Sequence, residues 1–534
     1  MVINLDLFSV GKVIRAMKKF ITSIAVVLVF GVGCNKRARR TDSDTLVVLV
    51  DAVHRDLDPR FALTSHDTKL SRLIAPGLTT VDTQDLNPKK LLAEEIDELN
   101  ETLWQVKIKK GIRFSDGTPL TAEDVAYTYN SVMSDAIGSL HKKSFRKRYK
   151  EIVVVDELTL KFILHEPLAT IMSDFAFGIV SKKVSELKNE VFDDGRVLGA
   201  GVYKIDSFSP ENIELSENLH YWGARPKTPK IRLKTVRDSS ARNLMMIGGS
   251  ADLTQNSIRA DLVDTIAAKD RIKAIDGRSA ILTYMMMNNE DPLLADPRVR
   301  RAIAYGIDRK RIVKEKILGR ALLATGFLPP GHWAYEDRLA HYNYDPEKAK
   351  KLLDEAGYTD PDGPGGKPRM SLSYKTSANQ FRLAIARVIA SQLLEIGIDV
   401  DVRTFEFGTF FADIKKGRYQ LGAMDTAPIT EPDYYYTYFH SERIPTKEHP
   451  HLHNRWRYKN KRIDELTLAG RKTASFEKRK EIYREVQVLL AEDLPVLPLW
   501  HLDNVALVNR TLEGYEVLPN ASFAYLPFVE KHRE

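Results

Sequence analysis

The chain has 534 residues, of which 43% are hydrophobic and 28% are charged. These proportions are typical of soluble globular proteins, and the length predicts two or three domains rather than a single core. The net charge of +8 comes mainly from residues 1–43, which hold eight of the 80 basic residues and two of the 72 acidic ones. The remainder is close to neutral, which excludes the broad positive field of a nucleic-acid-binding protein.

The first predicted element is a secretory signal over residues 17–34. Lys18 and Lys19 form its positive start, and an apolar run over 20–30 follows. The run is shorter than the roughly 20 residues that cross a bilayer as a helix, so we interpret the segment as a cleavable signal. This interpretation places the start of translation at Met17.

Cys34, the only cysteine of the chain, ends this segment and is the predicted site of lipidation. The small residues Gly31 and Gly33 precede it, and the segment resembles a bacterial lipobox, except that Gly31 stands where lipoboxes usually carry leucine. Lipid chains on Cys34 would anchor the protein to a membrane, and residues 35–44 would form a flexible tether. The alternative is ordinary cleavage with a free, buried cysteine.

Beyond residue 44 the hydrophobic pattern alternates between the strand and helix periods, which predicts an α/β fold. Strands are predicted at 45–50, 104–108, 372–374 and 398–405 and within 494–508, and helices at 121–133, 308–317, 345–357 and 380–396, from Asp296 onward and within 459–492. Cap signals mark the helix starts, such as Asp345 followed by Pro346. The order of strand, helix and strand over 372–405 predicts a right-handed βαβ unit.

Several motifs follow one another in an order that resembles a known family. They are Leu57-Asp58-Pro59, Ala75-Pro76-Gly77-Leu78, the stretch from Gly111 to Val125, the turn from Gly199 to Lys204, Asn218 to Trp222, Asp296 to Asp308, Asp345 to Gly357, Asn454 to Asn460 and Ala491 to Leu499. From about Thr45 to Phe528 the chain resembles the peptide/nickel family (family 5) of extracytoplasmic substrate-binding proteins of ABC transporters. Most of the motif residues have structural roles, such as turns and helix starts.

The resemblance implies a two-lobed periplasmic-binding-protein fold (class II-like) with an extra small subdomain, in which the lobes close over the ligand. The expected first lobe comprises residues 45–79, 195–290 and 495–534, the small subdomain 80–194, and the second lobe 291–494. The resemblance also implies a monomer that works with a permease and an ATPase complex, needs no cofactor and resides in the periplasm or at the cell surface.

Peptide-binding relatives hold the peptide between the lobes by backbone pairing and place an acidic residue against its α-ammonium. The matching positions are Leu63, Thr64, Ser65, Tyr284, Met285, Met424, Asp425, Thr426, Pro428 and Trp500. Pro428 stands where those relatives have an aspartate, three residues before Glu431, and proline offers no charge. Asp425 is the nearest acid, and it either takes over the ammonium or is a solvated or capping aspartate. If it does not bind the ammonium, the ligand has no free amine.

Three further features each have a functional and a structural interpretation. Arg382 pairs with a ligand carboxylate or lies at the surface. An aromatic run stacks on a ligand or packs in the core; its members are Tyr434, Tyr435, Tyr436, Tyr438 and Phe439. His449, His451 and His453 alternate, so on an extended segment they share one face. They are candidate ligands for Ni²⁺, Zn²⁺ or Cu²⁺, or incidental histidines of an exposed loop.

The sequence contains no H-E-x-x-H, G-x-S-x-G or P-loop motif. We therefore expect a binding protein rather than an enzyme, which captures oligopeptides or dipeptides in a cleft and delivers them to the permease. An oligosaccharide or a nickel or other metal complex is the alternative ligand. A secreted hydrolase is the alternative class of protein, and turnover of a candidate peptide would distinguish it.

Overall fold

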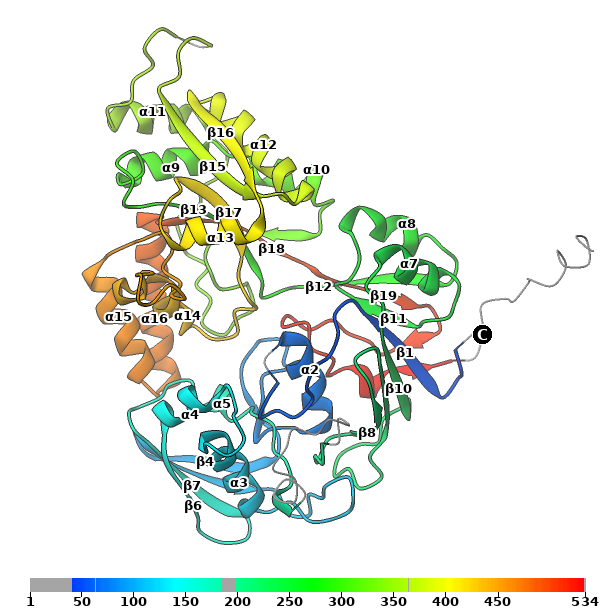
Figure 1. Ribbon diagram of the computed structural model, residues 1–534. Coiled ribbons are helices and arrows are strands. Elements are labelled where there is room, and N and C mark those ends of the chain that lie inside the picture. The colour runs from blue at the N-terminus through cyan, green and yellow to red at the C-terminus, as the bar shows by residue number, and fades with distance from the viewer. Residues whose placement is uncertain (1–40, 63, 184–196, 364, 533–534) are drawn as a thin grey trace, which may run out of the picture.

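The computed structural model describes residues 41–62, 64–183, 197–363 and 365–532. Within these ranges the chain forms three bodies, each built around its own β-sheet (Figure 1). We call them lobe one, around a seven-stranded sheet, lobe two, around a six-stranded sheet, and the small subdomain, around a four-stranded sheet. The predicted signal, with Cys34 at its end, and most of the predicted tether lie outside the described residues. None of the helices in the described ranges is long and apolar enough to span a membrane.

Lobe one joins three distant parts of the chain in one sheet, in the order β12-β19-β11-β1-β10-β9-β8. Its strands are β1 (Thr45–Val50), β8 (Tyr203–Phe208), β9 (Asn212–Glu217), β10 (Lys230–Thr235), β11 (Leu253–Gln255), β12 (Ile272–Gly277) and β19 (Asn504–Asn509). The helices are α2 (Ser65–Ile74), α7 (Ser239–Ile247), η1 (Ala260–Leu262), α8 (Val263–Ala267) and η3 (Leu526–Phe528), and a small ribbon pairs β20 (Leu512–Glu513) with β21 (Glu530–Lys531).

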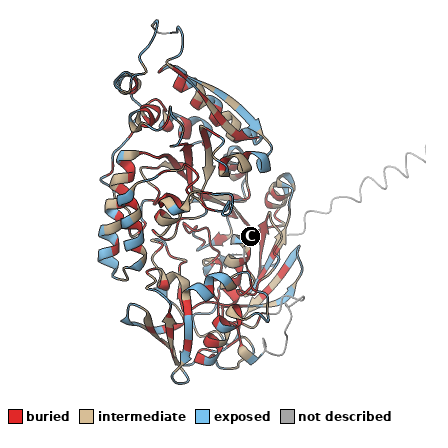
Figure 2. Ribbon diagram, turned by 60° about the vertical axis from the view of Figure 1, so that its left-hand side comes forward, coloured by how far each residue is buried: buried red, intermediate tan, exposed pale blue. Residues whose placement is uncertain are grey.

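The central strand β1 is apolar along its whole length because both faces of the sheet are covered. Leu46, Val48 and Val50 pack in the core that contains α2, whereas Val47 and Leu49 pack in the core beneath α7 and α8. The strand pairs in parallel with β10 on one side and β11 on the other. In Figure 2 the buried residues lie mainly inside the bodies, and the outer faces of the helices are exposed.

Lobe two has the strand order β14-β18-β13-β17-β15-β16. Its strands are β13 (Leu282–Met287), β14 (Ala321–Leu323), β15 (Met370–Ser377), β16 (Ile398–Phe405), β17 (Leu421–Asp425) and β18 (Val496–Leu502). Its helices are α9 (Pro297–Tyr305), α10 (Arg309–Lys316), α11 (Pro346–Glu355), α12 (Gln380–Leu394), α13 (Phe407–Lys415), α14 (Tyr434–Phe439), η2 (Ser441–Arg443), α15 (Lys461–Lys472) and α16 (Phe476–Asp493). The strands β15 and β16 are parallel and flank α12, as the strand-helix-strand pattern predicted.

The small subdomain is an antiparallel sheet in the order β4-β5-β7-β6, covered by helices. The strands are β4 (Ala93–Asn100), β5 (Leu103–Ile108), β6 (Tyr149–Val154) and β7 (Thr159–Leu164), beside a short pair of β2 (Thr79–Thr80) and β3 (Lys89–Lys90). The helices are α3 (Ala122–Met133), α4 (Lys142–Arg148) and α5 (Ile171–Asp174). Thr121 precedes α3 as its N-cap, and its amide donates to the carboxylate of Asp124 at 2.9 Å in a capping box.

Two connections join lobe one to lobe two: residues 278–281 link β12 to β13, and Asp503 links β18 to β19. Both β13 and β18 therefore lie in the sheet of lobe two, although the sequence analysis placed residues 282–290 and 495–502 in the first lobe. The apolar run over 494–508 has the period of one strand, but it divides at Asp503 into strands of two different sheets. Arg320 of lobe two pairs with Asp264 and Asp276 of lobe one beside these connections.

The glycines of the motif from Gly199 to Lys204 allow lobe one to pack closely. A Cβ atom at Gly199 would lie 2.1 Å from the carbonyl oxygen of Ile74, and one at Gly201 would lie 2.2 Å from that of Leu73. Both carbonyls belong to the last turn of α2. The motif therefore has the structural role that the sequence analysis expected for most family landmarks.

The start of the described chain is held against the end of lobe one by a buried lysine. The ammonium of Lys531 lies 3.0 Å from the carboxylate of Asp252 and donates to the backbone oxygens of Asp42 and Thr45 at 2.7 and 2.8 Å. It also lies 2.6 Å from the hydroxyl of Thr41. The side chain of Asp252 is fully buried, so this ion pair is shielded from solvent.

Candidate ligand-binding cleft

Lobe one contributes the start of α2 to the predicted cleft. Thr64 is exposed and is the N-cap of α2, where its hydroxyl accepts a hydrogen bond from the amide of Asp67 at 3.1 Å. The carboxylate of Asp67 is buried and lies 3.2 Å from Nδ1 of His54. Ser65 is the first residue of α2, and Leu63 lies outside the described residues. The helix start is thus fixed by capping, which holds the exposed Thr64 in one position.

Lobe two contributes a cavity of about 220 Å³ between the ends of its strands and the first turn of α12. Tyr374, Trp500 and Leu499 line its apolar side, and both Trp500 and Tyr374 are almost completely buried. Thr283, Thr376, Asn379, Phe381, Arg382 and Asp425 line the rest. An apolar base with a few polar groups is the usual composition of a site for a small organic ligand.

Asp425 and Arg382 form an ion pair in the wall of this cavity, with 2.7 Å between the Nη2 atom and the carboxylate. The same carboxylate accepts a hydrogen bond of 2.9 Å from the hydroxyl of Thr283. The Asp425 side chain is 32% exposed and that of Arg382 is 34% exposed. A pair this exposed contributes little to stability, so its charges remain open to a ligand.

Thr426 and Pro428 follow Asp425 along the same wall, in a segment that is hydrogen-bonded to the connection between the lobes. The buried Thr426 accepts from the amide of Leu282 at 3.0 Å, and the amide of Ile429 donates to Ala280 at 2.8 Å. Pro428, between them, is half-buried. The segment is therefore fixed both to β13 of lobe two and to the connection that precedes it.

Tyr284, Met285 and Met424 lie on the neighbouring strands β13 and β17 but do not line this cavity. Tyr284 and Met285 are fully buried and point into opposite cores of lobe two, because neighbouring residues of β13 face opposite sides of its sheet. Met424 is half-buried, and its sulfur atom lies 4.0 Å from the Nη1 atom of Arg455. Their positions are those of core residues.

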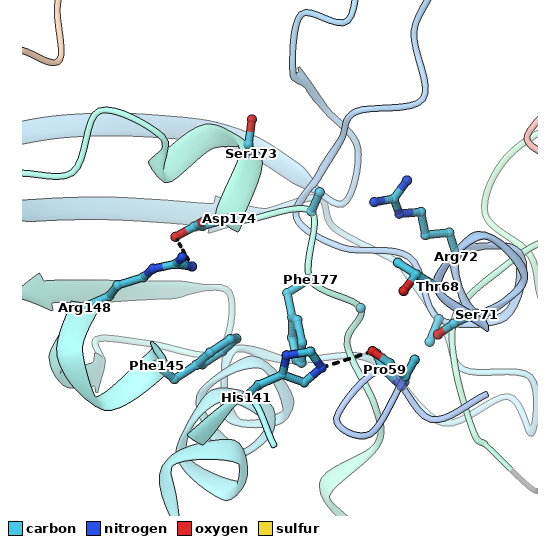
Figure 3. Close-up of a pocket in the computed structure, with 14 residues that line it drawn as sticks. Pro59, Thr68, Ser71, Arg72, His141, Phe145, Arg148, Ser173, Asp174 and Phe177 are labelled. Carbon is cyan, nitrogen blue, oxygen red and sulfur yellow. Dashed lines mark hydrogen bonds and ion pairs between the residues drawn. The ribbon is translucent and has the colours of Figure 1, made fainter. Parts of the chain in front are cut away.

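A second cavity, of about 240 Å³, lies between α2 of lobe one and the small subdomain (Figure 3). On the subdomain side, Arg148 pairs with Asp174 at 2.8 Å, and Phe177 lies beside His141. His141 holds the backbone oxygen of Ala62 at 3.1 Å, two residues before Thr64. Burial raises the pKa of Asp174 to about 6, with repulsion from Glu431 and Asp433 adding to the shift and Arg148 opposing it.

The small subdomain and lobe two meet at the edge of this second cavity. The hydroxyl of Ser173 donates a hydrogen bond to the carboxylate of Glu431, which also pairs with Arg479 at 3.0 Å. Burial raises the pKa of Glu431, although Arg479 opposes the shift. Close by, the amide of Ala169 donates to the backbone oxygen of Arg471 at 3.0 Å. Glu431 is therefore engaged in a contact between the two bodies.

A third cavity, of about 440 Å³, lies beside the connections between the lobes. Lobe one and the connection line it with residues 275–279, 515–517 and 519, lobe two with residues 329–332, and the small subdomain with Gln84 and Leu86. His332 of this group is buried, and burial lowers its pKa to about 4, so it is neutral at pH 7. Its Nε2 atom lies 3.3 Å from the backbone oxygen of Thr430, near the end of the segment that contains Pro428.

Three of the five residues of the aromatic run are buried and have the packing role, and Tyr434 and Tyr436 are half-buried. Tyr435, Tyr438 and Phe439 are buried on α14 and pack against Phe327 or Trp456. Tyr434 stacks on Tyr438, with 5.9 Å between ring centroids.

The three histidines are not gathered around one point. His449 and His451 are exposed, and their ring centroids are 5.9 Å apart. His453 is half-buried against Tyr438, and burial lowers its pKa to about 4. In the described part of the chain, no group of three or more His, Cys, Asp or Glu residues has the arrangement of a metal site.

Sequence reasoning did not single out four polar residues of the second cavity: Ser71, Arg72, His141 and Ser173. Ser71 and Arg72 lie inside an amphipathic helix, where such residues usually face solvent. His141 and Ser173 lie far along the chain in irregular or short elements without a motif. Only the packing of the small subdomain against α2 brings these four residues together.

Two lobes joined by two connections define the two-lobed periplasmic-binding-protein fold, and solved structures with this fold superpose on the chain. The AppA protein of Bacillus subtilis in complex with a nonapeptide has a TM-score of 0.68 at 24% identity, over 92% of this chain and 99% of that one. NikZ of Campylobacter jejuni in complex with Ni(L-His) has a TM-score of 0.73 at 22% identity, over 92% and 100%.

The family follows from the sequence match. Residues 87–445 match the bacterial extracellular solute-binding proteins, family 5, and the chain belongs to this family, whose members are substrate-binding proteins of ABC transporters. The oligopeptide-binding protein AppA of Bacillus subtilis is 28% identical over 480 residues, which cover 85% of each protein. The glutathione-binding protein GsiB of Escherichia coli K12 is 26% identical over 493 residues, which cover 90% of this chain and 93% of GsiB.

Proposed function

We propose that the chain captures short peptides between lobe one and lobe two and delivers them to an ABC permease, without catalysing a reaction. The observation that carries the proposal is the ion pair of Asp425 and Arg382, which places two partly exposed opposite charges in the wall of the lobe-two cavity. A peptide carries an ammonium at one end and a carboxylate at the other. The ion pair between Asp425 and Arg382 can therefore be replaced by two pairs with the peptide, Asp425 with the ammonium and Arg382 with the carboxylate. The peptide-binding relative AppA supports the same class of ligand.

In this proposal Asp425 holds the α-ammonium, the role that Pro428 cannot fill. Its Oδ1 atom accepts from Thr283, and its Oδ2 atom, which accepts from Arg382, becomes available to the ammonium when Arg382 pairs with the peptide carboxylate instead. Trp500 and Tyr374 supply the apolar surface of the cavity beneath it. Binding favours the closed arrangement by the difference in affinity between the closed and open states.

The test compares tetra-alanine with N-acetyl-tetra-alanine, which has no ammonium, by isothermal titration calorimetry. We expect acetylation to weaken binding at least tenfold in the wild type and less than twofold in Asp425→Asn. The matched control is Asp360→Asn, because Asp360 lies in lobe two and its side chain is also 32% exposed. Equal affinity of both peptides for the wild type would contradict the role of Asp425. Native mass spectrometry without any co-purified or added peptide bound would contradict peptide binding itself.

We also propose that the protein is monomeric and is anchored to the membrane through lipid on Cys34. The spacing of Cys34 after an apolar run supports this proposal. The test is fractionation of cells that express the wild type or Cys34→Ser. The wild type is expected in the membrane fraction and the variant in the soluble extracytoplasmic fraction; a wild type found only in the soluble fraction would contradict the anchor.

A further inference from the structure

The cavity between α2 and the small subdomain contains polar groups whose hydrogen-bonding capacity is not used by the protein. Ser71 is 2% exposed, and its hydroxyl has no hydrogen-bond partner among the described residues. The Nε atom of Arg72 is likewise buried and has no partner there, while its Nη1 atom pairs with Asp82 at 2.7 Å. Buried donors are normally paired, because an unpaired one loses its bond to water without replacement, so two neighbouring unpaired donors on one cavity wall point to a ligand.

Both groups lie on the wall that faces the small subdomain. In Figure 3 the side chains of Thr68, Ser71 and Arg72 project from α2 toward Phe177 and the α5 residues Ser173 and Asp174. The opposite wall is partly apolar. The cavity thus offers two donors on one side and an aromatic surface on the other, in about 240 Å³.

The charges of the lining select the kind of ligand group. Arg72 and Arg148 are the cations of the lining, and Asp174 is its carboxylate, already paired with Arg148. A guanidinium N–H forms its strongest hydrogen bonds with a carboxylate, and the hydroxyl of Ser71 adds a second donor. The methylene groups of an acidic side chain match the apolar wall.

The position of the cavity connects it with the ligand site proposed above. Ala62 lines it two residues before the exposed Thr64, and Ser173 lines it while bonding to Glu431 of lobe two. The cavity therefore adjoins the place where all three bodies meet. A peptide between the lobes can direct one side chain into it.

We infer that this cavity is a specificity pocket that takes an Asp or Glu side chain of the peptide, with Arg72 and Ser71 as the binding residues. The inference rests on the proposed peptide function and deepens it, because it names acidic peptides as the preferred class. It also gives the small subdomain a part in ligand selection.

The test uses the full chain and two series of tetra-alanine peptides, in which Glu or Gln replaces each residue in turn, measured by isothermal titration calorimetry. At one position the Glu peptide is expected to bind at least tenfold more tightly than the Gln peptide. Arg72→Gln is expected to reduce this ratio to less than twofold while the Gln peptide retains its affinity. Arg113→Gln is the control, because Arg113 is an exposed arginine of the small subdomain, and it should leave the ratio unchanged.

Ser71→Ala is the second variant, because it removes an unpaired hydroxyl and so should fold at least as stably as the wild type. We expect it to lower the affinity for the Glu peptide several-fold. Equal binding of Glu and Gln peptides at every position would overturn the specificity pocket and leave peptide binding intact. Failure of both series to bind would overturn the pocket and the proposed function together.

Discussion

Ser173 of the small subdomain donates a hydrogen bond to Glu431 of lobe two, so two bodies that are separated along the chain share one buried carboxylate. Arg479 of α16 pairs with the same carboxylate, and its guanidinium also lies over the ring of Trp333. Glu431 thus takes part in two interactions, a hydrogen bond with the small subdomain and an ion pair inside lobe two. Both are lost if Glu431 is replaced.

Replacing Glu431 by alanine is expected to destabilise the protein by about 3–5 kcal/mol, because the nearly buried Arg479 loses the carboxylate that neutralises it. Urea unfolding followed by circular dichroism measures the change. Glu448→Ala is the control, since Glu448 lies in an exposed loop, and it should change stability by less than about 0.5 kcal/mol. Similar losses in both variants would contradict the buried pair.

The stability of the small subdomain is expected to depend on pH through Asp174. The folded-state pKa of about 6 lies above the unfolded value, so the folded protein holds a proton that the unfolded chain has released. The resulting stabilisation is complete below about pH 4 and is lost as the pH rises through 6. We expect Asp174→Asn to gain on the order of 1–3 kcal/mol relative to the wild type between pH 4 and 7. Thermal unfolding measures this difference, and a difference that does not vary with pH would contradict it.

Met285→Ala is expected to lower the free energy of unfolding by about 2–5 kcal/mol, because the side chain is fully buried in the core of lobe two and its removal leaves a cavity. The affinity for tetra-alanine should change by less than twofold. Unfolding and titration calorimetry on the same sample separate the two effects. A large loss of affinity at unchanged stability would instead place Met285 in the ligand site.

The histidines at 449, 451 and 453 are expected not to form a tight metal site. Two of them are exposed, and the third is half-buried beside the aromatic cluster of α14. Equilibrium dialysis with Ni²⁺ should give no stoichiometric binding at about 10 μM metal, and the triple alanine variant should behave like the wild type. Stoichiometric binding that the triple variant loses would contradict this expectation.

Much of the fold was predictable from local signals. The continuous apolar run at Thr45–Val50 predicted a strand, and the structure shows it buried on both faces. The caps Asp296, Asp308 and Asp345 all begin helices, where their side chains accept backbone hydrogen bonds. Such signals act over three or four residues, and the sequence contains them completely.

The parts that sequence reasoning missed depend on contacts between distant segments. Asp425 was interpreted as an ammonium-binding residue or as a solvated or capping aspartate, and its pairing with Arg382 could not be predicted because it requires β17 to lie beside the start of α12. Tyr284 and Met285 matched ligand-lining positions, yet both are buried, because β13 is covered on both faces. The division at Asp503 is also invisible locally, since strands of either sheet carry the same apolar pattern.

The lysine that holds the start of the described chain bonds this start to lobe one and not to lobe two. Lys531 ties Thr41 and Asp42 to Asp252 of lobe one, so any load on the preceding segment is carried by lobe one. With the anchor proposed at Cys34, lobe one would be the part held at the membrane, and closure would be a movement of lobe two relative to it. A transporter that contacts both lobes would sense occupancy as a displacement of lobe two measured against lobe one.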